Sequence, residues 1–248
     1  MRLILILFIL TYSLQAAAIT VAAAANVGYA MRDLTTAFHK LHPTLHVKVI
    51  IGSSGKLSAQ IRNNAPYDLF LSANMGYAQK LFEDGYATTK PIIYVKGKLV
   101  LFSKTPRDLS DALTLLTHKE IKKIAIANPK TAPYGVAAKE ALQNAGIYNI
   151  LKPKFVYGES ISQTTLYALR STDVGIISKS SLFVPQMLKY KKNKNWIDIS
   201  TDYYTPIKQG MVILKYGKNN EAVKSFYNFL QTKEAKDIFE KFGYEQGN

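Results

Sequence analysis

Four short turns rich in small, hydroxyl and amide residues carry the chemistry that this sequence suggests. Each follows an apolar run and precedes a helical pattern: AAAAN ends at Asn26, GSSG spans 52–55, NPKTAPYG spans 128–135 and GESIS spans 158–162. The first backbone N–H groups of a helix have no partner inside the helix, and the positive end of the helix dipole favours an anion. The positions expected to touch a ligand include no acid and no histidine. The set therefore predicts a neutral, donor-rich site for a small anion.

An ordinary structural role is the alternative for each turn taken alone. Asn26, Ser53, Ser54 and Ser160 are residue types that commonly cap helix N-termini, and Tyr134 in the PYG turn is compatible with simple packing. The case for a site is the recurrence of the pattern, with two such turns in each half of the chain.

Signatures of catalysis and of metal binding are weak. GSSGKL lacks the spacing of a phosphate-binding loop, and neither G-x-S-x-G nor H-E-x-x-H occurs. His39, His42 and His46 lie close in sequence, but Pro43 breaks the helix between the last two and no acidic partner is near. We therefore predict a protein that is not an enzyme, with no cofactor and no direct metal-cation ligands.

Alternating strands and helices must position the four turns. Strand patterns are predicted over 19–26, 45–51, 67–74, 99–104, 123–129, 154–160, 174–178 and 210–217. Helices are predicted between most of them and over 221–241; in the first, Met31, Leu34 and Phe38 recur at helical spacing. This alternation predicts βαβ units, a mostly parallel sheet and two α/β lobes, with the turns at the carboxyl ends of the strands, where ligands bind in such sheets.

The amino-acid composition limits the classes of partner that the protein can bind. The 248 residues include no cysteine, which excludes disulfides, thiolate metal sites and a lipid-modified cysteine. The formal net charge of +15 favours anionic partners in general. The lysine-rich stretch 189–195 is typical of a solvated surface, and arginine is not interleaved with aromatic residues as in RNA-binding segments. We expect no nucleic-acid partner.

The first residues predict export. Arg2 precedes an apolar stretch from Leu3 to Leu10, and small residues follow Gln15, which is the pattern of a secretory signal peptide over 1–18, cleaved near Ala18. No later segment is long and apolar enough to span a bilayer. We therefore expect the mature protein to be soluble and to lie outside the cytoplasm.

The four turns and their flanks resemble the periplasmic molybdate-binding proteins of ABC importers. The resemblance is carried by ITVAAAANV, by SSGKLSAQIRNNAPYDLFLSA, by ANP with PYG and AAKEAL, and by VGII, and it runs from about Ile19 to the C-terminal FYNFLQTKEAKDIFEKFGY. It implies a two-lobed periplasmic binding protein fold of type II. Each lobe would be a mixed, mostly parallel sheet flanked by helices, with the ligand in the cleft between the lobes. The implied lobes are 19–95 plus 208–248, and 96–207.

The resemblance also implies a function and a set of ligand contacts. The protein would be a solute receptor that binds molybdate, and also tungstate, and delivers it to a membrane permease; we expect a monomer. Carried over turn by turn, the implied contacts with the oxyanion are Ala25, Asn26, Ser54, Tyr134 and the backbone N–H of Ile161. Some relatives carry a tyrosine contact after the VGII strand, where this chain has Ser178.

Other functions stay open at this point. Neutral donors select a fully deprotonated oxyanion, because a protonated one also needs an acceptor, and sulfate meets this criterion as well as molybdate and tungstate. An organic acid usually calls for an arginine; only Arg62 and Arg170 lie near the turns, and we expect both on outward helix faces. An enzyme on the same scaffold would need a general base that the turns do not supply. Ser54 is the expected donor of the GSSG turn, and we expect Lys56 to point to solvent.

Overall fold

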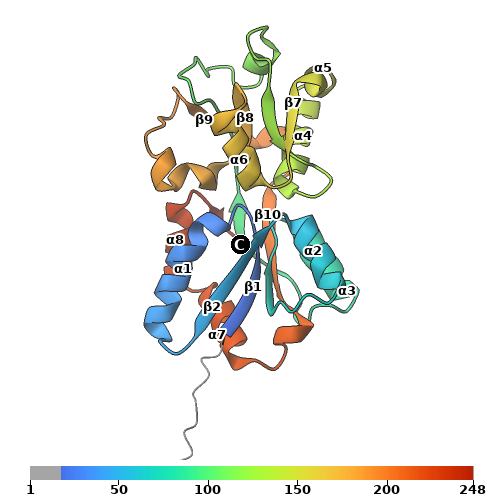
Figure 1. Cartoon of the computed structure of the whole chain (residues 1–248), viewed down its shortest axis with the longest axis vertical. Coiled ribbons are helices and arrows are strands. Elements are labelled where there is room, and N and C mark those ends of the chain that lie inside the picture. Colours follow the sequence, from blue (N-terminus) through green and yellow to red (C-terminus); the bar gives the residue numbers. More distant parts are fainter. Residues whose placement is uncertain (1–17, 248) are drawn as a thin grey trace, which may run out of the picture.

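The computed structural model describes residues 18–247. The predicted signal peptide therefore lies outside the described residues, except for Ala18. Two α/β units lie one above the other in Figure 1, and each is built on its own sheet. No helix among the described residues is long and apolar enough to cross a membrane.

The first sheet has six strands in the order β11-β4-β10-β3-β1-β2. Their bounds are β1 Ala18–Ala24, β2 His46–Gly52, β3 Leu69–Leu71, β4 Ile92–Gly97, β10 Ile207–Ile213 and β11 Glu245–Gln246. Side chains of β1 alternate between the two faces of this sheet, as the period of a strand requires. Ile19, Val21 and Ala23 face the cluster formed with α1 (Gly28–Leu41), α7 (Glu221–Phe229) and α8 (Lys233–Lys241). Ala22 faces the cluster formed with α2 (Ser54–Arg62) and α3 (Met75–Glu83).

The second sheet has five strands in the order β7-β6-β8-β5-β9. Their bounds are β5 Leu99–Phe102, β6 Ile124–Ala127, β7 Phe155–Gly158, β8 Val174–Ser178 and β9 Trp196–Asp198. One face packs against α4 (Pro133–Asn144) and α5 (Tyr148–Leu151), and the other against α6 (Ile161–Arg170). The first sheet and its helices are called the first unit below, and the second sheet and its helices the second unit.

The chain passes between the units twice. Lys98 alone separates β4 of the first sheet from β5 of the second, and residues 199–206 lead from β9 back to β10. These passages lie near the predicted limits of the lobes, but the division into 19–95 plus 208–248 and 96–207 stays a prediction.

The two sheets are mixed, and antiparallel pairs are more frequent than the sequence pattern suggests. Four strand pairs are parallel and five are antiparallel among the described strands. The βαβ units supply the parallel pairs. The antiparallel pairs arise beside the two passages, where β4, β5, β9 and β10 run, and where β11 adds to the edge of the first sheet.

Most predicted elements exist within a few residues of their predicted bounds, and β4 is the main omission. Its segment, PIIYVKG, follows a proline and has no period-two alternation of polar and apolar residues, so pattern reasoning does not separate it from a loop or a helical turn. It forms a strand because β10 and β11 pair with it on both sides.

The aromatic cluster beneath the first sheet should carry much of the stability of its unit. Phe226 is fully buried, and its ring centroid lies 4.9 Å from that of Phe38 and 6.1 Å from that of Phe229. We predict that Phe226→Ala lowers the free energy of unfolding by about 3–5 kcal/mol, because it removes apolar contacts and leaves a cavity. Tyr216→Ala is the control, since Tyr216 is 71% exposed, and it should change stability by less than about 0.5 kcal/mol. Equal shifts in the urea midpoint for the two variants would contradict this prediction.

Candidate functional site

The structure brings the four turns together where the two units face each other. The Gly55 N–H donates to the Thr131 carbonyl (2.9 Å), the Ser162 hydroxyl to the Ala25 carbonyl (3.0 Å), and the Ser180 hydroxyl to the Asn26 carbonyl (3.2 Å). Each of these hydrogen bonds joins the first unit to the second. The turns that precede α1, α2, α4 and α6 therefore form one contact region.

The five predicted contact residues are all buried in this region. Asn26 and Ser54 are fully enclosed, and Tyr134, Ile161 and Ala25 are 2%, 3% and 4% exposed. Ala25, Tyr134 and Ile161 also belong to one apolar cluster although they come from three different turns. The structure thus brings the five together, while their contact with a ligand stays a prediction.

Several backbone donors in the region have no acceptor among the residues that the structure describes. Among residues 18–247, none accepts a hydrogen bond from the backbone N–H of Asn26, Ser54 or Ile161. Ser54 and Ile161 are the first residues of α2 and α6, and neither helix has an acidic residue in its first turn. Ala25 differs, because its N–H donates to the Gly52 carbonyl at 2.9 Å. Ala25 therefore has no free donor and contributes its small size and its carbonyl contact with Ser162.

Two hydroxyl groups are held so that their protons stay available. The Ser54 oxygen accepts the Ala73 N–H at 2.9 Å, and the Tyr134 oxygen accepts the side-chain N–H of Gln209 at 3.2 Å. No described residue accepts a hydrogen bond from either hydroxyl. A hydroxyl whose oxygen already accepts a buried N–H is left to act as a donor. Ser54 and Tyr134 thus present donors, as the sequence predicts for Ser54.

The close approach of the two units explains the glycine in the GSSG turn. A Cβ atom at Gly55 would lie 2.7 Å from the Tyr77 hydroxyl and 2.9 Å from the Thr131 carbonyl. Any side chain there would push the second unit away from the start of α2. Lys56 follows on the exposed face of the helix, as expected.

The capping interpretation is right for Ser160 and wrong for Asn26. The Ser160 hydroxyl accepts the Gln163 N–H at 3.3 Å, which is an ordinary N-cap bond. Asn26 does not cap α1; its side-chain NH₂ donates to Gln209 Oε1 (2.8 Å) and to the Tyr244 hydroxyl (2.9 Å). Asn26 Oδ1 is buried and has no partner among the described residues.

The turn pattern did not identify the buried polar residues behind the turns. Gln209, Tyr94, Tyr244 and Ser180 are enclosed beside Asn26 and Tyr134. The available signal was a polar or hydroxyl-bearing residue on the buried side of a mostly apolar strand, as Gln209 is in IKQGMVI and Tyr94 in IIYVKG. Ser178, which replaces the tyrosine of some relatives, is also buried, and its hydroxyl lies within hydrogen-bond distance of the Ser180 hydroxyl, with 3.1 Å between the two oxygens.

Burial keeps the tyrosines of this region in their neutral form. It raises the pKa of Tyr94 and of Tyr134 well above the usual value, and it raises the pKa of Tyr244 as well. Burial also raises the pKa of Tyr29, on α1, against a smaller opposing effect of hydrogen bonding with Ser162 and Thr165 on α6. The region is therefore a set of uncharged groups, and its hydroxyls hold protons that they can donate.

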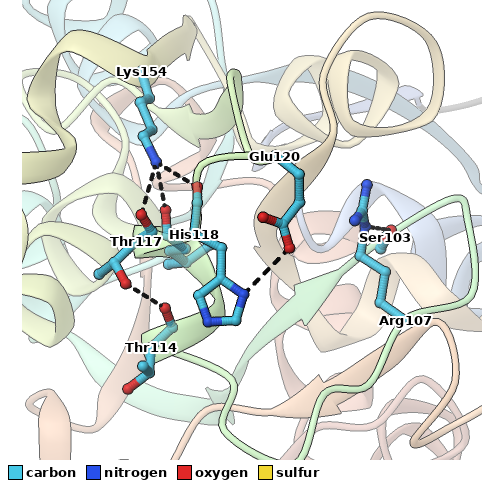
Figure 2. Close-up of polar contacts among 8 residues, drawn as sticks. Ser103, Arg107, Thr114, Thr117, His118, Glu120 and Lys154 are labelled. Atoms are coloured by element: carbon cyan, nitrogen blue, oxygen red, sulfur yellow. Dashed lines mark hydrogen bonds and ion pairs between the residues drawn. The ribbon is translucent and has the colours of Figure 1, made fainter.

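The best histidine–carboxylate pair outside the turns has a structural role. Figure 2 shows His118 beside Glu120, with 3.3 Å between the ring nitrogen and the carboxylate. The Lys154 ammonium donates to the carbonyls of Leu116, Thr117 and His118 at 3.0–3.4 Å and so caps a 3-10 helix, Thr114–Thr117. The Thr117 hydroxyl donates to the Thr114 carbonyl instead of approaching His118. Lys154 thus caps the C-terminal end of the 3-10 helix, and neither His118 nor Glu120 has a hydroxyl nucleophile hydrogen-bonded to it among the described residues.

The other charged candidates also lie outside the contact region. The rings of His39 and His46 stack at 5.5 Å, and the described residues contain no group of three side chains suited to hold a metal ion. Arg62 pairs with Asp84, and Arg170 is exposed. Open surface hollows of about 720 and 590 Å³ are lined by many charged residues, such as Lys40 and Lys139, and by none of the five predicted contact residues, although the second hollow borders residues 128–130 of the NPKTAPYG turn. The uncharged donor set, and not the size of a hollow, defines the candidate site.

Two sheets with helices on both faces, joined by two passages and facing each other across buried helix starts, define a two-unit α/β binding protein. A family model described as bacterial extracellular solute-binding protein matches residues 19–245. The chain therefore belongs to this family, which makes it a binding protein and not an enzyme.

Individual relatives agree with this membership. The chain is 39% identical over 200 residues to the molybdate-binding protein ModA of Rhodobacter capsulatus, covering 80% of this chain and 77% of the relative. It is 35% identical over 240 residues to a molybdate-binding protein ModA of Azotobacter vinelandii, covering 95% and 93%. The solved structure of the Azotobacter vinelandii periplasmic molybdate-binding protein superimposes with a TM-score of 0.86 at 28% identity, covering 93% of this chain and 100% of that one. The predicted fold class and family are confirmed.

The neutral tyrosines predict how stability depends on pH. Because the pKa of Tyr94 is raised in the folded protein, the folded state keeps a proton that the unfolded state loses above the ordinary tyrosine pKa of about 10. The free energy of unfolding should therefore fall as pH rises above about 10, by about 1.4 kcal/mol per pH unit for each such group. Tyr94→Phe should reduce this slope by the contribution of one group, which is about 1.4 kcal/mol per pH unit. Phe239→Leu disturbs the same packing, since the two rings lie 5.6 Å apart, but removes no proton. Identical slopes for wild type and Tyr94→Phe in urea unfolding between pH 9 and pH 11 would refute this prediction.

Proposed function

We propose that this chain is the extracytoplasmic receptor of an ABC importer that binds molybdate, and also tungstate, and delivers it to a membrane permease. The observation that carries the proposal is a set of buried donors for which residues 18–247 supply no acceptor: the backbone N–H groups of Asn26, Ser54 and Ile161 and the hydroxyls of Ser54 and Tyr134. Relatives of 39% and 35% identity are molybdate-binding proteins by name, which supports the choice of oxyanion.

The physical requirement is the replacement of water around a buried dianion. Burying an ion costs several kcal/mol even after the protein relaxes. A hydrogen bond to a charged group contributes roughly 1.5–3 kcal/mol, so several donors together offset the loss of hydration. Helix starts add a favourable electrostatic contribution, and α2, α4 and α6 each begin in this region without an acidic residue in the first turn.

The same donor set supports selection for a fully deprotonated oxyanion. A ligand that keeps a proton at neutral pH, such as hydrogen phosphate, needs an acceptor to match it. None of the five proposed contact residues is acidic. An organic acid usually pairs with an arginine, and Arg62 is engaged with Asp84 instead.

The proposal includes the export and the motion of the protein. The signal peptide over 1–18 would send the chain to the periplasm, where it would act as a monomer. The lobes, 19–95 plus 208–248 and 96–207, would close on the ligand by rotating about the two passages. The hydrogen bonds that Gly55, Ser162 and Ser180 make between the units support a closed state.

Calorimetric titration tests the ligand. The purified chain without its first 18 residues should release or absorb heat with molybdate and tungstate at micromolar concentrations. It should bind sulfate more weakly and phosphate not at all, because phosphate is protonated at neutral pH. No heat with either metal oxyanion would refute the proposal, and tighter binding of sulfate would favour a sulfate receptor on the same donor set.

Ser54 and Lys56 provide a matched pair of variants in one turn. Ser54→Ala removes a proposed donor and should weaken molybdate binding by about 1–3 kcal/mol, or about 5- to 150-fold. Lys56→Ala removes a positive charge whose side chain is exposed, and it should leave the affinity within about twofold, since exposed charges interact weakly. A larger loss for Lys56→Ala than for Ser54→Ala would show that charge, and not a neutral donor, holds the anion.

A further inference from the structure

Gln209 is the residue through which the polar groups behind the turns are connected. It lies on β10, two residues after the chain returns to the first sheet, at a register shift between Gln209 and Gly210. Its side chain is fully buried. Oε1 accepts the Asn26 NH₂ (2.8 Å) and the Tyr94 hydroxyl (3.1 Å), and Nε2 donates to the Tyr134 hydroxyl (3.2 Å). One amide therefore contacts two of the proposed ligand residues, one in each unit.

The direction of this amide decides what Tyr134 can do. Nε2 can only donate, so the Tyr134 oxygen accepts and the hydroxyl proton stays available. If an acceptor stood in place of Nε2, the Tyr134 hydroxyl would donate to it, and its proton would be lost to a ligand. The two further acceptor bonds at Oε1, from Asn26 and Tyr94, fix the amide in the orientation that keeps Nε2 toward Tyr134.

The contact between Tyr134 and Gln209 requires a glycine at position 97, because there is no space for a side chain there. A Cβ atom at Gly97, the last residue of β4, would overlap the Tyr134 hydroxyl and lie 2.7 Å from Gln209 Nε2. Gly97 and Gln209 lie on neighbouring strands, β4 and β10, and each is close to a passage between the units. Tyr134 of the second unit therefore packs against Gly97 and Gln209 of the first unit.

We propose that Gln209 is a positioning residue of the oxyanion site, which sets the Tyr134 hydroxyl as a donor and holds the Asn26 side chain away from the ligand. This inference rests on the proposed function. Since the Asn26 NH₂ is engaged by Gln209 and Tyr244, Asn26 serves the ligand through its backbone N–H. A turn of the Asn26 amide would bring Oδ1 against Gln209 Oε1, two acceptors in contact, so Gln209 also opposes that turn.

A double-mutant cycle with Tyr134 tests whether Gln209 acts through this hydroxyl. Gln209→Met removes the amide at similar volume and should weaken molybdate binding by about tenfold or more, as expected for one lost donor to a charge. In a Tyr134→Phe background, the same change should cost less than about threefold, because the hydroxyl that it orients is absent; residues in contact are generally not additive. Lys208→Met is the control from the neighbouring position, whose side chain is exposed, and it should bind as wild type.

Gln209→Glu tests the polarity of the group at nearly constant shape. A protonated carboxyl can donate to Tyr134 as Nε2 does, whereas a carboxylate accepts from Tyr134 and repels the anion. Burial raises the pKa of such a carboxyl into a range that titration reaches. The titratable groups that face it are the hydroxyls of Tyr94 and Tyr134, with Tyr244 beyond Asn26. Relative to wild type at the same pH, this variant should bind molybdate better at pH 6 than at pH 9.

The outcomes separate this inference from the proposed function. If wild type binds neither molybdate nor tungstate, the proposed function fails and the inference fails with it. If wild type binds but Gln209→Met binds equally well, or loses the same factor with and without Tyr134→Phe, Gln209 does not act through Tyr134 and the inference alone is overturned. A Gln209→Glu protein that is equally weak at both pH values would also overturn it. Urea unfolding of each variant at both pH values ensures that only folded protein is compared.

Discussion

The hydrogen bonds between the two units are the interaction on which the proposed site depends. Neither unit alone holds a complete set of donors, because Asn26 and Ser54 come from the first and Tyr134 and Ile161 from the second. The contacts of Gly55 with Thr131 and of Ser162 with Ala25 bring these groups into one buried region. A region assembled from two halves excludes water only when the halves meet. Capture and release of a ligand can therefore be controlled by the distance between the units.

The polar groups behind the turns are neutral. Tyr94, Tyr134 and Tyr244 keep their protons because burial disfavours the charged form, and Gln209 and Asn26 cannot ionise. A neutral network costs less to bury than a charge, even with Asn26 Oδ1 left without a partner among the described residues, whereas a buried counter-charge would demand a partner of its own when the ligand leaves. The net charge of the sequence is +15, and the described lysines and arginines, such as Lys56 and Lys139, are exposed or half-buried. Such charge favours long-range attraction of anions, whereas none of the five proposed contact residues is charged.

The sequence allowed prediction of the turns and not of the network that orients them, for a physical reason. Ser54, Tyr134 and Ile161 lie at junctions where a strand period gives way to a helix period, and this change is visible locally. Gln209 and Tyr244 meet Asn26 across 183 and 218 residues of chain, and no local pattern encodes such a pairing. The failure at β4 has the same origin, since its strand state comes from pairing with β10 and β11. The capping interpretation of Asn26 failed because the residue type suits both a cap and a buried network.

The position of Gln209 and Gly97 would link the orientation of donors to the proposed movement of the units. Both residues lie beside the passages about which the lobes would rotate in the proposed closure. Tyr134 is carried by α4 of the second unit, so its contact with Gln209 exists only when that unit rests against β4 and β10. In an open state the Tyr134 hydroxyl would be exposed to water and free to turn. Closure would then restrict it to donation toward the ligand, so that the same movement that excludes water also orients a donor.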